Sequence, residues 1–311
     1  MNEKNEIRLG ALSAGFAYFI WGLLPIYWKW LGHVEADEIL ANRVFWSFIF
    51  MLIVLFSTKK MGVFFQTLKQ LKERKKQLAA LTIASLLVTS NWFIYIFAVN
   101  SNQMVEASLG YYINPLVSVL LGMLVLKEKL TTAQYISFGF ATAGVLILTL
   151  SYGQFPWIAL ALAFSFGLYG LAKKLIKVDS AIGLTLETMV VTPVALGYMI
   201  VLFLRGDHAF LASTINSDLL LVGAGAATAI PLLYFAKGAQ IIPLSMLGFL
   251  QYIAPTLTLI LGVFVYGEEF SSVHLLSFMF IWLALTIYSI SRTKLFAKWE
   301  LQWKRRKGFE M

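Results

Sequence analysis

Long apolar runs, each near the length of a membrane-crossing helix, follow one another along the chain. A hydrocarbon core about 30 Å thick requires roughly 20 apolar residues in a helix. Ten segments reach or approach that length, at residues 9–29, 39–57, 78–99, 105–126, 133–150, 157–172, 182–204, 218–237, 242–266 and 273–291. No stretch alternates apolar and polar residues as a membrane barrel strand does. The pattern therefore predicts an all-α polytopic membrane protein with ten transmembrane helices.

The amino-acid composition excludes several kinds of functional site. Apolar residues make up 59% of the chain and charged residues only 13%, where soluble domains carry about 25% charged residues. The chain has no Cys, which excludes disulfides, thiolate metal sites and cysteine nucleophiles. It has no Walker sequence for ATP, no paired D-x-x-x-D acids for Mg²⁺, and its three His share no ligand spacing. We expect neither catalytic residues nor a metal site or cofactor.

The basic residues are distributed unevenly along the chain. If the amino terminus is cytoplasmic, all of the 25 Lys and Arg except Lys29, Arg43 and Arg205 fall on the inner side. The first outer loop is instead acidic, with Glu35, Asp37 and Glu38 (the outer acids). This asymmetry follows the positive-inside rule and predicts that both termini are cytoplasmic. The basic loop 59–76 and the basic tail 292–311 are expected to face lipid headgroups rather than nucleic acid.

A sequence repeat divides the chain. Residues 112–130 and 252–270 match at an offset of 140, and the offset persists into the next helix. The identical pairs in this block are Tyr112/Tyr252, Ile113/Ile253, Pro115/Pro255, Leu121/Leu261, Gly122/Gly262, Val125/Val265 and Glu128/Glu268. A weaker similarity links the first and sixth helices at an offset of 148. Chance apolar similarity rarely places Pro, Gly and Glu at the same spacing.

The repeat predicts two five-helix halves, 1–150 and 151–291, followed by the tail 292–311. Because five is odd, the second half is expected to lie inverted in the membrane, with Pro115 over Pro255 and Glu128 over Glu268. Glu128 is then expected to cap a cytoplasmic helix end, and Glu268 an extracellular one. Inverted repeats are typical of secondary transporters that bind a small molecule near the midplane. A channel or facilitator is the alternative, and an integral membrane enzyme acting on lipid-linked substrates is a weaker one.

The duplicated P-x6-G-x5-E block resembles the EamA-type halves of the drug/metabolite transporter superfamily. Several longer segments resemble its RarD branch, namely ALSAGFAYFIWGLLPIYWKWL (11–31), EILANRVFWS (38–47), SNWFIYIFAVN (90–100), ASLGYYINPL (107–116) and GLTLETMVVTPVALGYM (183–199). The resemblance implies a permease or exporter of the bacterial cytoplasmic membrane. The substrate, the direction of transport, the coupling ion and the oligomeric state stay open at this point.

Neutral polar residues near mid-helix are the candidates for substrate binding, because the bundle interior accommodates them better than lipid does. They are Asn91, Tyr95, Tyr112, Asn114, Gln251 and Tyr252. Pro115 and Pro255 lie beside them, and each proline frees a backbone carbonyl one turn earlier. The sequence therefore predicts a midplane site, or a hinge, at these two prolines.

Arg43 and Glu187 are charged residues that lie several residues inside predicted membrane spans, and we assign them gate or structural roles. Arg43 is expected to reach toward the outer acids, and Glu187 toward Lys173, Lys174 and Lys177. Trp21 is a further candidate for the pathway.

Other residues have expected roles in membrane anchoring and helix packing. Trp28 and Trp30 are expected in the outer interfacial belt. The pairs Gly139/Ala143, Gly223/Ala227 and Gly225/Ala229 have the spacing of close helix–helix contacts.

Overall fold

The computed structural model describes residues 3–100, 103–176, 178–212, 214–267 and 271–291. Within these ranges the chain forms helices and no strand. The helices are α1 (Glu3–Trp30), α2 (Ala36–Ser57), α3 (Met61–Glu73), α4 (Lys75–Asn100), α5 (Met104–Leu124), α6 (Thr132–Tyr152), α7 (Trp157–Leu175), α8 (Ser180–Arg205), α9 (Ile215–Ile241), α10 (Leu244–Gln251), α11 (Ile253–Ile260), the π-helical η1 (Leu261–Val265) and α12 (Ser272–Ser291).

Among the described residues, ten helical segments are long and apolar enough to cross a membrane. This confirms the predicted fold class. Nine of them are single helices, and the ninth span in chain order, Leu244–Val265, combines α10, α11 and η1. Glu268 and the tail 292–311 lie outside the described residues.

Pro255 explains why the ninth span is divided. A proline has no N–H to donate to the carbonyl four residues earlier, here that of Gln251. The helix ends at Gln251 and restarts at Ile253. Pro115, at the matching place in the repeat, lies inside an unbroken α5.

Local sequence signals define several helix ends. Thr131 and Gln134 form a capping box at the start of α6, and the Asp179 carboxylate accepts the backbone N–H groups of Ala181 and Ile182 at the start of α8. Gly153 and Gly206 end α6 and α8 with φ of 75°, a left-handed conformation that glycine adopts without strain.

The basic stretch 59–76, expected to be a loop, contains helix α3. Its Phe64 and Leu71 are buried against the main core, while Val63 and Phe65 are more than half exposed. The sequence signal for this helix is the set of apolar side chains at helical spacing among the lysines.

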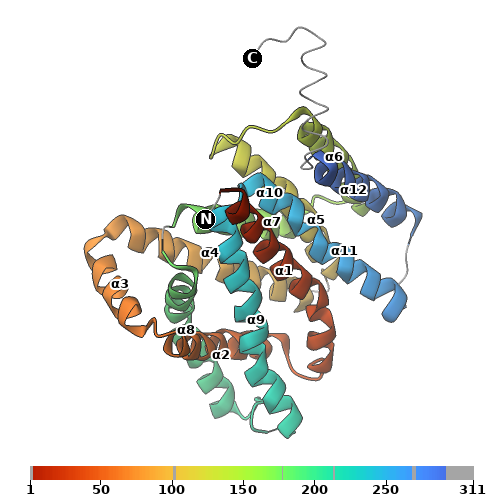
Figure 1. Cartoon of the computed structure of the whole chain (residues 1–311). Helices are drawn as coiled ribbons and strands as arrows, with labels where there is room; N and C mark the ends of the chain where they lie inside the picture. The colour runs from red at the N-terminus through yellow and green to blue at the C-terminus, as the bar shows by residue number, and fades with distance from the viewer. Residues whose placement is uncertain (1–2, 101–102, 177, 213, 268–270, 292–311) are drawn as a thin grey trace, which may run out of the picture.

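The helices pack in pairs through small residues. Helix α2 packs on α8 and α9, α5 on α10, and α6 on α12; Figure 1 shows α6 and α12 side by side, on the opposite side of the bundle from α3. At Gly225 of α9 a Cβ would lie 2.3 Å from the Trp46 backbone carbon in α2, so this predicted close contact is confirmed. At Gly139 a Cβ would meet nothing within 4 Å, so that prediction is wrong.

Large apolar side chains point outward on the membrane-spanning helices. Phe56, Leu204 and Phe264 are 78%, 78% and 83% exposed. A soluble protein rarely exposes so many large apolar groups together, so this surface fits a lipid environment.

Candidate functional site

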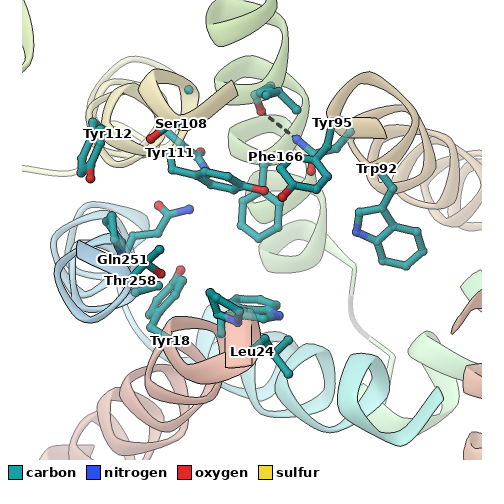
Figure 2. A pocket seen from close by; sticks show the side chains of 18 of the residues that line it. Tyr18, Leu24, Trp92, Tyr95, Ser108, Tyr111, Tyr112, Phe166, Gln251 and Thr258 are labelled. Carbon is teal, nitrogen blue, oxygen red and sulfur yellow. Dashed lines mark hydrogen bonds between the residues drawn. The ribbon is translucent and has the colours of Figure 1, made fainter. Parts of the chain in front are cut away.

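A cavity of about 250 Å³ lies inside the bundle, lined by residues of α1, α2, α4, α5, α7, α9, α10 and α11. Figure 2 shows side chains from these helices pointing toward one shared space. Aromatic side chains make up more than a third of the residues in its wall. The aromatic side chains are Tyr18, Trp21, Trp28, Trp92, Tyr95, Tyr111, Tyr112 and Phe166. Aromatic walls with a few polar groups are typical of small-molecule sites.

The structure brings most of the sequence-predicted binding residues to this cavity. Asn91, Tyr95, Tyr112, Asn114 and Gln251 line it, whereas Tyr252 does not. The Tyr252 side chain is 1% exposed, and its hydroxyl donates to the Tyr112 carbonyl at 3.4 Å. Tyr252 therefore joins α5 to the start of α11 rather than forming part of the cavity wall.

Three amide side chains line the cavity and differ in how many hydrogen-bond partners they have. The Asn91 Nδ2 donates to the Leu162 carbonyl at 2.9 Å and to Ser165 Oγ at 3.0 Å. The Gln251 Oε1 accepts from Ser118 Oγ at 3.2 Å, and Figure 2 shows its amide pointing into the cavity. The Asn114 Oδ1 is buried and has no hydrogen-bond partner among the described residues. Buried polar atoms are normally hydrogen-bonded. We therefore call the Asn114 Oδ1 an open acceptor, that is, a buried oxygen able to accept a hydrogen bond from a ligand.

Tyr18 is a second unsatisfied group. Its side chain is 1% exposed, and its buried hydroxyl has no partner among the described residues. Sequence reasoning missed Tyr18 and Phe166, although both line the cavity. The weaker repeat offset of 148 aligns Tyr18 with Phe166, and this equivalence was the available signal for both.

Arg43 differs from its prediction. It does not turn to the outer acids; it lines the cavity, where its Nε donates to Thr228 Oγ1 at 3.1 Å. Its guanidinium carbon lies 5.0 Å from the ring centroids of Trp28 and of Trp92, within cation–π range. The expectation that Trp28 belongs to the interfacial belt is therefore wrong, whereas Trp30 is 60% exposed. Figure 2 shows Trp92 at the edge of the same space.

Other predicted gate or structural residues lie in different places. Trp21 and Pro255 line the cavity, and Pro115 and Glu187 do not. The Pro115 carbonyl would lie 2.7 Å from a Cβ at Gly248, so α10 packs directly against α5 there. Glu187 is paired with Lys173, one of its expected partners, at 2.7 Å and with both side chains 2% exposed. Lys177 lies outside the described residues.

An aromatic layer separates the cavity from this ion pair. Phe235 packs against Trp21 and Phe166 of the cavity wall, with ring centroids 5.6 and 5.3 Å apart. On its other side Phe235 stacks on Tyr169 at 5.8 Å, and the Tyr169 hydroxyl donates to Glu187 at 3.1 Å. The cavity therefore ends at a layer of packed rings.

Glu128, Glu106 and Glu38 accept backbone N–H groups of other segments, and of these three the sequence predicted a capping role only for Glu128. Glu128 accepts the N–H groups of Leu244 and Ser245, the first two residues of α10, at 2.6 and 2.9 Å. Glu106 accepts the Ile158 N–H at the start of α7, at 2.6 Å. Glu38 accepts the N–H groups of Ala209 and Phe210. For Glu106 and Glu38 the missed signal is an acidic residue near a helix start or tight loop, where backbone N–H groups lack partners.

The spacing of the duplicated G-x5-E block has a structural reason in the first copy. A Cβ at Gly122 would lie 2.8 Å from Glu128 Oε2. The Glu128 N–H also donates to the Gly122 carbonyl at 3.0 Å. Gly122 therefore leaves the space in which the Glu128 carboxylate reaches α10.

The fold and the cavity define a class: a helical, multi-pass membrane protein with a chamber for a small molecule inside the bundle. Comparisons with known proteins agree. Residues 8–150 match the model of the EamA-like transporter family. A solved protein structure superposes with a TM-score of 0.69 at 18% identity, covering 90% of this chain and 96% of that one, which shows the shared fold.

Several proteins have higher sequence identity to this chain than that solved structure has. The chain is 49% identical to the uncharacterized transporter YojE of Bacillus subtilis, over 97% of this chain and 98% of the relative. It is 42% identical to Protein RarD of Escherichia coli, over 92% and 95%. It is 27% identical to the chloramphenicol-sensitive protein RarD of Pseudomonas aeruginosa, over 93% and 96%. The chain belongs to the EamA-like transporter family and is a multi-pass transporter of the bacterial inner membrane.

Proposed function

We propose that this chain is a secondary transporter that moves a small polar metabolite or drug-like solute by alternating access, with the cavity as its binding site. The observation that carries the proposal is the open acceptor of Asn114 inside a chamber lined by both parts of the chain. A buried oxygen left without a partner costs free energy. A bound solute, or water before it binds, supplies the missing donor.

We also propose that the halves 1–150 and 151–291 are inverted repeats that move against each other. Helices that match in the repeat pack on one another: α2 on α8, α5 on α10 and α6 on α12. Contacts between different helices also come in matching pairs, since α1 packs on α9 and α7 packs on α4. A two-fold relation between the halves produces this pattern, and it supports alternating access.

In this proposal the aromatic layer and the Lys173–Glu187 pair form the closed cytoplasmic gate. Phe235 fills the space between the cavity wall and Tyr169. With both termini cytoplasmic, the carboxyl-terminal end of α7 is the inner end, so the ion pair lies on the cytoplasmic side of the cavity. Among these contacts, those of Phe235 with Tyr18 and Trp21 join the second half to the first, so opening inward requires these rings to separate.

The test is solute counterflow in proteoliposomes. An untargeted comparison of intracellular metabolites between deletion and overexpression strains first supplies the candidate solutes. A carrier gives counterflow that saturates with solute concentration, whereas a channel or facilitator gives flux that does not saturate. Saturating counterflow supports the proposal, and strictly non-saturating flux overturns it.

Side-chain variants link transport to the cavity. Asn114→Ala and Gln251→Ala should each lower counterflow at least tenfold while protein abundance in the membrane stays at the parental level. Asn216→Ala and Gln66→Ala are matched controls, because both side chains are exposed and neither lines the cavity. Parental rates in both cavity variants would mean that the site is elsewhere.

A further inference from the structure

The cavity carries an unbalanced positive charge. Arg43 is the only charged side chain among the described residues that line it. The two ion pairs found in the described part of the chain, Lys60–Asp179 and Lys173–Glu187, do not include Arg43. The nearby acids are engaged elsewhere: Glu38 with backbone N–H groups, and Asp37 with the Tyr198 hydroxyl.

The surroundings of Arg43 compensate this charge only in part. Trp28 and Trp92 each offer a ring face at 5.0 Å, and cation–π contacts are weaker than pairing with an anion. Thr228 takes the Nε–H. A guanidinium has five N–H donors, so the four on its two terminal nitrogens have no acceptor among the hydrogen bonds described. A charge placed in a water-poor site without a counter-ion is costly.

The free part of the guanidinium matches one kind of ligand group. Two parallel N–H groups of a guanidinium fit the two oxygens of a carboxylate, which gives a short, charge-assisted bidentate contact. The rest of the wall supplies ring faces and the neutral amides of Asn114 and Gln251. Among the described lining residues there is no carboxylate to receive an ammonium group.

We propose that the solute is a monoanion, a carboxylate attached to an aromatic or flat apolar body, and that Arg43 binds its carboxylate. This inference rests on the proposed transport function, because it assigns the substrate class of the same cavity. The carboxylate lies against Arg43 between Trp28 and Trp92. The body packs on the ring faces of Tyr18, Trp21 and Phe166, and Asn114 accepts a hydrogen bond from any donor that the body carries.

A purely structural role for Arg43 predicts something different. In that case its bond to Thr228 fixes α2 to α9, and solute charge has no influence on binding. Thr228→Val removes this bond and keeps the guanidinium. Arg43→Gln removes the charge and keeps a polar, though shorter, side chain.

The experiment measures ligand binding by the purified full chain in detergent, without transport. Three probes of similar size differ in charge: phenylacetate, 2-phenylethanol and phenethylamine. Binding is read from thermal unfolding midpoints and from the fluorescence of the cavity tryptophans Trp21, Trp28 and Trp92. We expect phenylacetate to bind at least tenfold more tightly than the neutral and cationic probes.

The variants assign that preference to Arg43. Arg43→Gln should abolish it, Arg43→Lys should retain part of it, and Thr228→Val should retain most of it. Arg205→Gln is the matched control, because Arg205 is exposed at the end of α8 and its loss should change nothing. The comparison of probes on the parental protein does not depend on whether any variant folds.

The outcomes separate this inference from the proposed function. Phenylacetate binding no better than 2-phenylethanol overturns the anion assignment, including the case in which no probe binds. Retention of the anion preference in Arg43→Gln overturns the role of Arg43. A clear anion preference in a protein with non-saturating flux would support the inference while overturning the carrier mechanism.

Discussion

Lys173 and Glu187 form an ion pair of 2.7 Å in which each side chain is only 2% exposed. The second oxygen of Glu187 accepts from the Tyr169 hydroxyl at 3.1 Å. The pair joins α7 to α8 just beyond the aromatic layer that closes the cavity. Buried pairs of this kind are costly to break on one side only, since one charge is then left uncompensated.

Lys173→Met should therefore destabilise the protein strongly. Removal of one partner of a buried pair costs about 3–5 kcal/mol, which appears as a lower thermal unfolding midpoint in detergent. Lys173→Met combined with Glu187→Met removes both charges and should recover most of the loss. A single variant as stable as the parental protein would show that the pair contributes nothing to the closed state.

Close packing at Gly225 predicts that alanine destabilises the protein there, and Gly197 is the matched control. Gly225→Ala places a Cβ 2.3 Å from the Trp46 backbone, so α2 and α9 must separate, which costs about 1–3 kcal/mol. Gly197→Ala meets nothing within 4 Å and should stabilise α8 by about 0.5–1 kcal/mol through helix propensity. Unfolding midpoints should therefore shift in opposite directions. The same direction for both would contradict the packing explanation.

Much of the fold was predictable from the sequence, because apolar run length reports membrane spans directly. A loosened helix before Pro255 was predicted, whereas the unbroken course of α5 at Pro115 and helix α3 were not. Helix α3 is a short amphipathic helix rather than a long apolar run. The predicted partners of Arg43 were also wrong, since the position of a residue along a helix does not tell which way its side chain turns. Its partners Trp28 and Thr228 come from other helices, whose rotations a single sequence does not define.

Glu128 should matter through its two acceptor oxygens. Each oxygen takes one backbone N–H at the start of α10. Glu128→Gln leaves a single acceptor oxygen and removes the negative charge from a helix N-terminus, which should cost about 1–3 kcal/mol. Glu73→Gln, at the exposed end of α3, is the matched control and should be neutral. Equal unfolding midpoints for the two variants would argue against the cap.

The Asp179 carboxyl should make the stability of the protein depend on pH. Burial alone raises the pKa of this carboxyl, but the hydrogen bond from Lys60, the backbone N–H groups of Ile182 and Ala181 and the charge of Lys60 lower its pKa overall. A lowered pKa in the folded state adds stability above the unfolded value near 3.8, and this contribution is lost as the pH falls through the folded value.

Asp179→Asn tests this contribution, since Asn also caps helices well. The parental protein should unfold at a higher temperature than Asp179→Asn at pH 6. The difference should shrink as the pH is lowered below about 4. A difference that is constant with pH would mean that the charge of Asp179 has no role.

The orientation of the bundle is the last prediction. All but three of the 25 Lys and Arg fall on one side of the ten spans, and this side should be cytoplasmic. Reporter fusions after Arg74, between α3 and α4, and after Lys304 in the tail should both read cytoplasmic. A fusion after Gln154, which is exposed between α6 and α7, should read external. With five spans between the amino terminus and Gln154, and ten before Lys304, these readings test whether each number of crossings is odd or even. An external reading at Lys304 would contradict an even number of spans, and a cytoplasmic reading at Gln154 would contradict an odd number of crossings between Arg74 and Gln154.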